Sequence, residues 1–528
     1  MLLQTAKAQK AADNRFTHGG GDLLALIRSA AEGLADAVLK RAGDIRSSDP
    51  ESSRTDAVFL IGPGNNGNDG LAAAEIVANK DKNITVRVFR PESLVRTGDK
   101  NADTLEKRLN GIGVKVFTVD NIFILQDTFA SLIRSSCCVV DCLFGSGFDP
   151  ERPFPEDVSN LISVTNAHSP FTISADIASG VSSDTGATAE AAIRADVTVT
   201  FGAPKPGHFI LPGKRLTGEL RVSKILITEG LFGVDAPECF AKADRGAVRA
   251  LLPKRDPYGN KYTMGRVLVI AGSLRYAGAA ILAVSAALRG GAGLVTAAVP
   301  FSIVAEVTAA CPEAVRLPLG NEDTLFMTGD HVDMLVDASS VSSAVVIGPG
   351  LGREPETVEA VLSFLKKTRC KKIVVDADAL FALASNSKDA RALFEGKEAV
   401  LTPHAGEAAR LLSVEPSVIS SKRLLSAMEI SSEYSAVTLL KGNDTIICGP
   451  SGRYTVNNTG NTALSKGGSG DVLAGLIGSL LASGTGAYDA ARAGAFIHGL
   501  AAETLSEKSS EYSVLPGDLP LAFSELMC

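Results

Sequence analysis

The stretch "GGSGD", residues 467–471, precedes a long apolar run and predicts a tight turn that opens a helix. Glycine lets the backbone approach an anion closely, and the free N–H groups of a first helical turn favour a phosphate. Asp471 closes this turn, although a carboxylate repels a phosphate. We therefore predict a phosphoryl-binding turn in which Asp471 is the general base for a hydroxyl group. The alternative is that Asp471 is only a helix N-cap, a position that aspartate favours.

Other polar side chains of the second half follow apolar strand patterns. Asp376 and Asp378 end "VVDADAL", His404 and Glu407 lie in "TPHAGE", and Lys441 begins "KGNDT". Parallel strands bring their carboxyl ends to one edge of a sheet, so we expect these groups to lie near the glycine turn. Two structural alternatives stay open: His404 as a capping or core histidine, and Lys441 as a solvated strand end.

In the first half, a turn rich in asparagine and glycine spans residues 62–70 as "GPGNNGNDG". Two further strands end in polar residues, Asp141 in "DCLFGSG" and Asp176 with Ser179 in "SADIASG". Their oxygen atoms could together hold a hard cation beside a phosphate-rich ligand. The alternative for the asparagine turn is one without a ligand, because Asn and Gly are common turn residues.

Composition argues against some classes of function. The 528 residues carry a net charge of −7 without a long basic run, which disfavours a nucleic-acid groove. The longest apolar runs, near 277–288 and 472–482, fall short of the roughly 20 residues that span a membrane. The eight cysteines and six histidines show no zinc spacing, and we predict that Cys137, Cys138 and Cys142 pack in a strand core. We expect no nucleic-acid partner, no membrane and a reducing compartment.

Strand and helix patterns alternate along nearly the whole chain, which predicts parallel sheets covered by helices. Between the two series of elements, residues 231–260 have charged residues, Pro and Gly but no strand pattern. We interpret this stretch as a connector. The fold class that we predict is α/β, with two αβα domains at residues 1–236 and 237–528.

Longer motifs carry a resemblance to two families. The first half is similar to the NAD(P)H-hydrate epimerase family in "GPGNNGNDG", "VVDCLFGSGF", "SADIASGVSSDTG" and "ADVTVTFGAPKPG". The second half resembles the NAD(P)H-hydrate dehydratase family in "VIGPGLG", "VVDADAL", "LTPHAGEAARLL", "LLKGNDT" and "NNTGNTALSKGGSGDVLAGLIGSLLASG". The resemblance implies a Rossmann-like epimerase domain followed by a ribokinase-like dehydratase domain, as in bifunctional nicotinamide nucleotide repair enzymes. It also implies that the N-terminus belongs to the first domain and is not a transit peptide.

For the first domain, the resemblance implies that Asp176 is catalytic and contacts the hydrate. It also implies a potassium ion, K⁺, held by Asn66, Asp141 and Ser179. The further hydrate-binding positions that it implies are Asn65, Asn66, Gly67, Asn68, Asp69, Gly145, Ser146, Gly147, Phe148, Asp149, Pro150 and Glu151.

For the second domain, the resemblance implies hydrate contacts at Ala279, Gly350, His404 and Asp471, with Asp471 catalytic. The nucleotide-binding positions that it implies are Lys441, Gly442, Asn443, Asp444, Thr445 and Gly470. The phosphoryl donor is expected to be ADP or ATP with Mg²⁺, and the fused two-domain form resembles users of ADP. We further expect a homo-oligomer in the cytoplasm, with the mitochondrion as the alternative compartment.

The implied reaction repairs hydrated NADH and NADPH. The epimerase interconverts the R and S hydrates, and the dehydratase phosphorylates the C6 hydroxyl of the S form and eliminates phosphate. The alternative function is a ribokinase-like kinase of a vitamin precursor, fused to a non-catalytic nucleotide-binding module. The Gly467–Asp471 turn suits both functions, whereas "TPHAGE" together with "KGNDT" favours the dehydratase.

Overall fold

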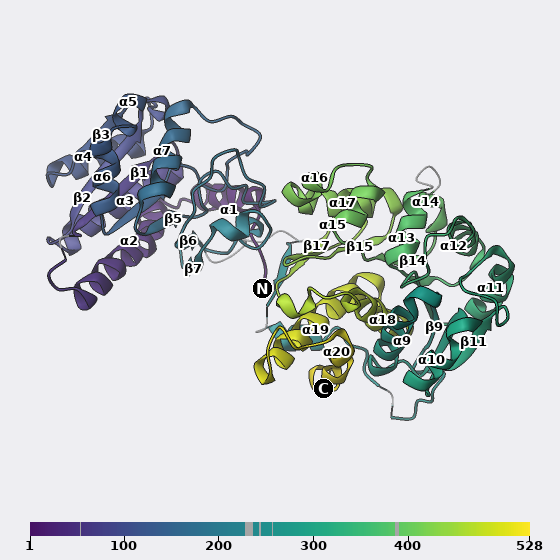
Figure 1. Cartoon of the computed structure of the whole chain (residues 1–528). Helices are drawn as coiled ribbons and strands as arrows, with labels where there is room; N and C mark the ends of the chain where they lie inside the picture. Colours follow the sequence, from purple (N-terminus) through teal and green to yellow (C-terminus); the bar gives the residue numbers. More distant parts are fainter. Residues whose placement is uncertain (53, 228–235, 242–243, 256, 386–389, 528) are drawn as a thin grey trace. The chain divides into compact units, whose positions relative to one another are not determined.

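The structure is a computed structural model that describes all residues except 53, 228–235, 242–243, 256, 386–389 and 528 (Figure 1). The chain divides into two compact units, Leu2–Pro237 and Glu238–Cys528, with Met1 grouped with the second. This division lies one residue from the expected domain boundary between 236 and 237. Among the described residues, no helix is both long and apolar enough to span a bilayer.

The first unit contains a seven-stranded sheet in the order β3-β2-β1-β4-β5-β6-β7. All neighbouring strands are parallel, and the order reverses between β1 and β4. This reversal is the point at which doubly wound sheets bind ligands, beyond the carboxyl ends of the strands. The strands are β1 (Asp56–Ile61), β2 (Thr85–Pro91), β3 (Val116–Val119), β4 (Cys138–Cys142), β5 (Thr172–Ala175), β6 (Val197–Phe201) and β7 (Glu219–Ser223).

Helices cover both faces of this sheet (Figure 1). On one face lie α2 (Leu23–Ser48), α3 (Asn65–Lys80) and α4 (Lys100–Gly111); on the other lie α5 (Asn121–Ile124), α6 (Asp127–Ser135) and α7 (Glu156–His168). A shorter α1 (Ala6–His18) precedes them. The expected strand core of cysteines is confirmed, because Cys137, Cys138 and Cys142 are buried free thiols in or beside β4.

The second unit has a ten-stranded sheet in the order β11-β10-β9-β12-β13-β14-β15-β16-β17-β8. It is parallel from β11 to β15 and antiparallel on both sides of β16. The strands are β8 (Glu238–Phe240), β9 (Arg266–Ile270), β10 (Leu294–Pro300), β11 (Val315–Leu319), β12 (Ala344–Ile347), β13 (Lys372–Val375), β14 (Glu398–Leu401), β15 (Val437–Leu440), β16 (Thr445–Cys448) and β17 (Tyr454–Asn457).

The prediction of a strandless connector over 231–260 is wrong. Within its described part, β8 pairs in parallel with β17, and Phe240 is buried against Phe496. Three residues are too short for a periodic pattern, and β8 becomes a strand only because the sheet edge at β17 accepts it. Residues 231–235, 242–243 and 256 of this stretch lie outside the described residues.

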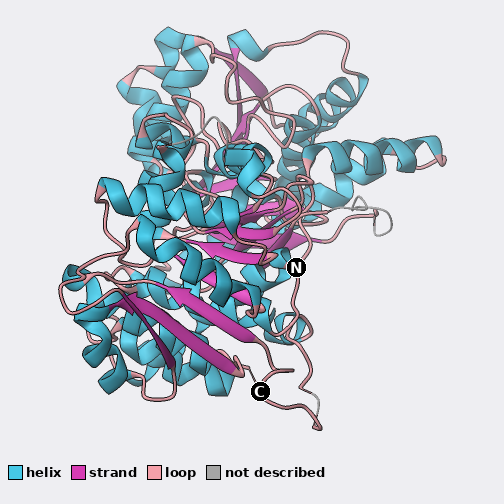
Figure 2. Cartoon of the chain, turned by 90° about the vertical axis from the view of Figure 1, so that its right-hand side faces the viewer, coloured by secondary structure: helices cyan, strands magenta, loops and turns pink. Residues whose placement is uncertain are grey.

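Helices also cover both faces of the second sheet (Figures 1 and 2). One face packs against α9 (Ala277–Arg289), α10 (Val304–Ala310), α18 (Ser469–Ala482), α19 (Ala487–Lys508) and α20 (Leu519–Leu526). On the opposite face, Figure 1 shows α12 (Pro355–Lys367), α13 (Ala377–Ala384), α15 (Ala405–Leu411) and α17 (Arg423–Tyr434). The expected architecture of two αβα units is therefore confirmed.

Candidate active sites

The prediction of a turn over residues 62–70 is only partly right, because α3 begins at Asn65 and only residues 62–64 precede it. Its N-cap residue Gly64 has φ 83° and makes no side-chain cap, so the first N–H groups of α3 stay open to a ligand. Asn66 follows with only 8% of its surface exposed, and neither atom of its amide group has a partner among the described residues. A buried amide without partners is costly, so it marks a position where a ligand or ion is expected.

At the ends of β4 and β5, Asp141 and Ser179 form a hydrogen-bond network. Asp141 accepts hydrogen bonds from the Ser179 hydroxyl at 2.6 Å and the Ser179 backbone at 2.9 Å. It also accepts one from the Ser174 hydroxyl at 2.8 Å and one from the Leu143 backbone at 3.2 Å. Both carboxylate oxygens are thus engaged, and the network ties the ends of β4 and β5 together. Burial nevertheless raises the pKa of Asp141.

Asp176 follows β5 and has φ 63°, which is uncommon for a residue with a side chain. The fully buried Lys205 pairs with its Oδ1 atom. Burial alone would raise the pKa of Asp176, but the Lys205 ammonium outweighs it, so this pKa lies below its ordinary value. The ring of His208 accepts from the Lys205 backbone at 3.0 Å and lies 3.0 Å from the Asp176 carbonyl. Burial lowers the pKa of His208 to about 4, so a neutral imidazole supports the pair.

Asp69 and Asp13 complete a group of carboxyls with different affinities for protons. Burial raises the pKa of Asp69 well above its ordinary value, and the charges of Asp176 and Asp13 add to this shift. Burial and the Asp176 charge also raise the pKa of Asp13. Asp69, whose pKa is raised, and Asp176, whose pKa is lowered, can serve as acid and base in one reaction.

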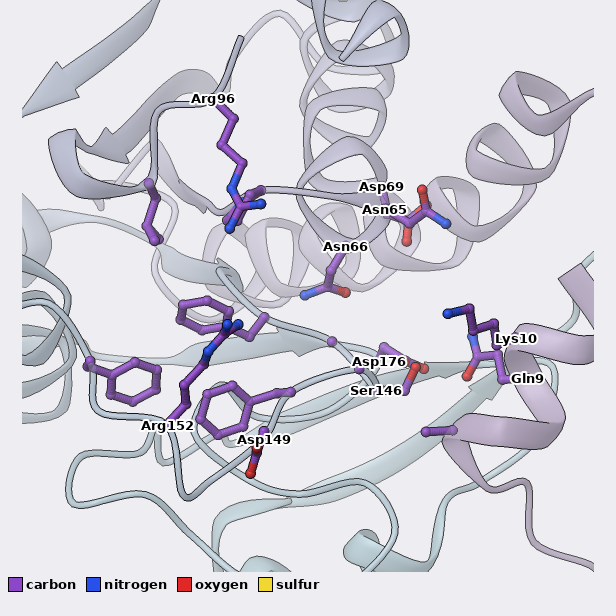
Figure 3. Close-up of a pocket in the computed structure, with 18 of the residues that line it drawn as sticks. Gln9, Lys10, Asn65, Asn66, Asp69, Arg96, Ser146, Asp149, Arg152 and Asp176 are labelled. Atoms are coloured by element: carbon purple, nitrogen blue, oxygen red, sulfur yellow. The ribbon is translucent and has the colours of Figure 1, made fainter. Parts of the chain in front are cut away.

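Asp13, Asn66, Asp69 and Asp176 line one cavity of about 1160 Å³ in the first unit, whereas Asp141, Ser179, Lys205 and His208 are outside its lining (Figure 3). The predicted hydrate-binding residues on its wall are Asn65, Asn66, Asp69, Gly145, Ser146, Gly147, Phe148, Asp149 and Asp176. Gly67, Asn68, Pro150 and Glu151 are outside the lining. Asn68 is buried, and its amide donates to Asp99, the N-cap of α4, at 3.1 Å. The structure therefore gives Asn68 a structural contact.

In the second unit, the glycine turn opens α18. The N-cap residue is Gly468, with φ 103° and no side-chain cap, and Asp471 lies in the first turn of the helix. The interpretation of Asp471 as the N-cap is therefore wrong. Burial raises the pKa of Asp471 to about 7, with the Asp376 charge adding to the shift and Lys441 opposing it. A carboxyl with this pKa can exchange a proton near neutral pH.

Lys441 is an ion-paired residue and not the solvated strand end of the alternative interpretation. Its ammonium lies 2.9 Å from Asp376 Oδ1 and 3.9 Å from Glu407. An ideal Cβ added to Gly470 would lie 3.1 Å from that ammonium. The glycine therefore lets the start of α18 approach the charged ends of β13 and β15 closely.

His404 caps α15, as its structural alternative expected. Its Nδ1 accepts from the backbone of Gly406 at 3.0 Å and of Glu407 at 3.3 Å. Asp444 also makes a structural contact, because it is fully buried and forms an ion pair with Arg423 at 2.9 Å. The hydrate contact of His404 and the nucleotide contact of Asp444 stay predictions.

Two cavities meet the start of α18. One of about 950 Å³ is lined by Ala279, Gly350 and Asp471, together with Tyr276 and Asp378. The other, of about 260 Å³, is lined by the predicted nucleotide-binding residues Lys441, Gly442, Asn443, Thr445 and Gly470. Asp471 and its neighbour Gly470 thus line different cavities at one helix terminus. The Asp471 carboxyl therefore belongs to the larger cavity, and the Gly470 backbone belongs to the smaller one.

Several residues of these sites were missed in the sequence. Lys205 lies in "GAPKPG", and nothing in the neighbouring sequence links it to Asp176. Lys10 and Asp13 come from α1, and Arg96 and Arg152 from loops. No short motif surrounds these residues, so only the tertiary structure brings them to the cavity.

Comparison with known protein families divides the chain in the same way. Residues 23–207 match the family model described as "YjeF-related protein N-terminus". Residues 267–522 match the family model described as "NAD(P)H-hydrate dehydratase". The two matches lie within the first and the second compact unit, respectively.

Curated relatives match across both units. The bifunctional NAD(P)H-hydrate repair enzyme of Moorella thermoacetica is 37% identical, covering 88% of this chain and 85% of the relative. That of Escherichia coli K12 is 34% identical, with 91% and 87% covered. A crystal structure of the ADP/ATP-dependent NAD(P)H-hydrate dehydratase from Bacillus subtilis, co-crystallised with ATP and Mg²⁺, is 29% identical, with a TM-score of 0.47, and covers 56% of this chain and 98% of its own. Because these curated relatives are more than 30% identical over most of both chains, the chain belongs to the family of bifunctional NAD(P)H-hydrate repair enzymes.

Proposed function

We propose that this chain repairs hydrated NADH and NADPH in two steps. The first unit interconverts the R and S hydrates, and the second unit dehydrates the S hydrate at the expense of ADP or ATP. The observation that carries the second activity is that Asp471, with a pKa of about 7, lines the larger cavity while the adjacent Gly470 lines the smaller one.

In the dehydration, the C6 hydroxyl of the hydrate lies in the larger cavity and attacks the terminal phosphorus of the nucleotide. The phosphoanhydride bond breaks, and AMP leaves from ADP or ADP leaves from ATP. Asp471 takes the hydroxyl proton, and the backbone N–H groups of Gly467–Gly470 stabilise the transferring phosphoryl group. The ring nitrogen's lone pair then expels phosphate from C6, and loss of the C5 proton restores the ring double bond. Hydroxide is a poor leaving group, which is why phosphorylation must come first.

Mg²⁺ would enter with the nucleotide. The described residues contain no group of three or more His, Cys, Asp or Glu that could hold a metal ion. Mg²⁺ usually keeps several waters and binds through substrate phosphates, so it needs no protein cage. When bound, it neutralises charge on the phosphates, while Lys441 adds a fixed positive charge beside Gly470.

One side chain of the first unit, the amide of Asn66, fits a potassium ion. Asn66 offers a buried amide oxygen without a partner, and oxygen is the ligand that hard cations prefer. Asp141 and Ser179 already bond one another, so the charge of Asp141 would act on an ion while its carboxylate also holds the fold. Such an ion would supply positive charge for the hydrate; Asp176 and Asp69 would still exchange the protons.

The potassium proposal is best tested at Asn66. Replacing Asp141 would break four hydrogen bonds, whereas Asn66→Ala removes an amide that has no partner. We expect potassium to accelerate epimerisation by the wild type and to have little effect on Asn66→Ala, with the melting temperature unchanged. Equal wild-type rates with and without potassium would contradict the ion site.

The function itself is tested by chromatography of mixed hydrate epimers, incubated with the protein and with ADP, ATP or no nucleotide. Without nucleotide, R and S should interconvert; with nucleotide, intact NADH or NADPH and phosphate should form. A stable phosphorylated product would instead support the vitamin-precursor kinase. Comparison of ADP with ATP decides the donor, and light scattering tests the proposed homo-oligomer.

A further inference from the structure

The cavity of the first unit has two chemically different ends. One end holds Asp69, Asp176 and the start of α3, which carry the acid and base groups of the proposed epimerase. The other end holds two arginines and a group of phenylalanines. In Figure 3, Arg96 and Arg152 reach into the cavity from opposite walls and point toward one another, away from Asp69 and Lys10.

The arginines come from separate loops and are free to bind an anion. Arg96 follows the short helix η1 (Glu92–Leu94), and Arg152 lies between β4 and α7. Both are exposed, and neither side chain makes an ion pair with any described residue. Asp149 lines the same region, but one of its oxygens accepts from the Glu151 backbone at 3.0 Å. Two unpaired guanidinium groups facing one space favour a phosphate, which they can bind by bidentate hydrogen bonds.

Phe144, Phe148 and Phe154 form an aromatic cluster in the same cavity as the arginines. The Phe144 and Phe154 rings stack at 5.2 Å and 22°, and the Phe148 and Phe154 rings at 5.1 Å and 21°. All three line the cavity and are half-buried. Half-buried aromatic rings next to two guanidinium groups suit a purine that carries a phosphate nearby.

Within the proposed epimerase, these features fix the direction of the substrate. The dihydronicotinamide ring must reach Asp176, and the open N–H groups at the start of α3 suit the pyrophosphate. The adenosine then extends toward the aromatic cluster. We infer that Phe144, Phe148 and Phe154 bind the adenine and that Arg96 and Arg152 bind the 2′-phosphate, so that the first site favours the hydrate of NADPH over that of NADH.

The test measures R-to-S conversion of each hydrate separately, without nucleotide, by the full chain. Arg96→Gln and Arg152→Gln should each raise KM for NADPH-hydrate about tenfold, the equivalent of one charge-assisted hydrogen bond. KM for NADH-hydrate and both kcat values should change little, because neither arginine touches the reacting ring. Arg108→Gln on α4 is the matched control, since this exposed arginine is not part of the cavity lining.

An independent readout uses adenosine 2′,5′-bisphosphate. It should inhibit the wild type competitively and raise its melting temperature, and both effects should weaken in the double variant Arg96→Gln/Arg152→Gln. Equal loss of both hydrates would overturn the inference in favour of pyrophosphate binding, and unchanged kinetics would overturn it outright. A wild-type chain that epimerises neither hydrate would instead contradict the proposed function itself.

Discussion

The ammonium of Lys441 lies 2.9 Å from Asp376 Oδ1, and Thr402 donates to the same oxygen at 2.7 Å. This pair joins the ends of β13 and β15 directly beside Gly470. Because Asp376 raises the pKa of Asp471 and Lys441 lowers it, the pair also affects the pH at which the Asp471 carboxyl loses its proton. The same ion pair therefore holds this edge of the sheet together and shifts the pKa of Asp471.

Asp471→Asn should reduce nucleotide-dependent dehydration by about 10²–10⁴-fold, because asparagine cannot accept a proton. Epimerisation by the other unit should remain at the wild-type rate. Thermal unfolding should show no loss of stability, and at pH 8 a gain, because the variant removes a charge that the folded state disfavours. Dehydration near the wild-type rate would exclude Asp471 as the base.

The pH dependence of dehydration should follow Asp471. Its raised pKa of about 7 means that the carboxyl is protonated, and inactive as a base, at lower pH. We expect kcat/KM to rise with pH through about 7 and then to level off. A profile that is flat between pH 5.5 and 8, on the order of one pH unit either side of that pKa, would contradict this assignment.

Lys441→Gln should move this profile to higher pH. Lys441 lowers the pKa of Asp471, so its removal should raise that pKa further above its ordinary value. The same substitution leaves Asp376 buried without its cation and should lower the melting temperature. Lys367→Gln is the control, because Lys367 forms an exposed ion pair with Asp333 on the surface of the same unit. An unshifted profile in Lys441→Gln would show that the cation does not act on Asp471.

Lys205→Met should destabilise the first unit by about 3–5 kcal/mol, the usual cost of leaving a buried charge without its partner. The pKa of Asp176 should rise once the lysine is gone, because burial then acts unopposed. Epimerisation should therefore fail below the new pKa of Asp176. The dehydration of pure S hydrate should be retained, and its loss would show that the two units do not act independently.

The two units should be separable at Pro237. A fragment from Glu238 keeps β8, whereas a fragment from Lys261 loses the strand and its buried Phe240. Phe240 burial alone contributes about 1.5–3 kcal/mol, so the shorter fragment should unfold at a clearly lower temperature. Equal stability of the two fragments, measured by calorimetry, would show that β8 contributes nothing to the second sheet.

The sequence by itself determined the alternating strands and helices, because period and apolar runs depend on neighbouring residues. It also determined the glycine turns that precede α3 and α18, since only glycine allows such backbone close to other atoms: a Cβ on Gly62 would lie 1.7 Å from the Leu143 carbonyl. The family followed from these turns and their flanking motifs.

Only the tertiary structure decided which charges meet. Lys205 reaches Asp176 from 29 residues away, and β8 pairs with β17 more than 200 residues further along the chain. It also decided that Asp471 is not an N-cap, that Asn68 holds Asp99, and that Arg96 faces Arg152 across a cavity. Such contacts carry no local pattern, because their geometry and their pKa shifts arise from burial and from charges that distant segments bring together.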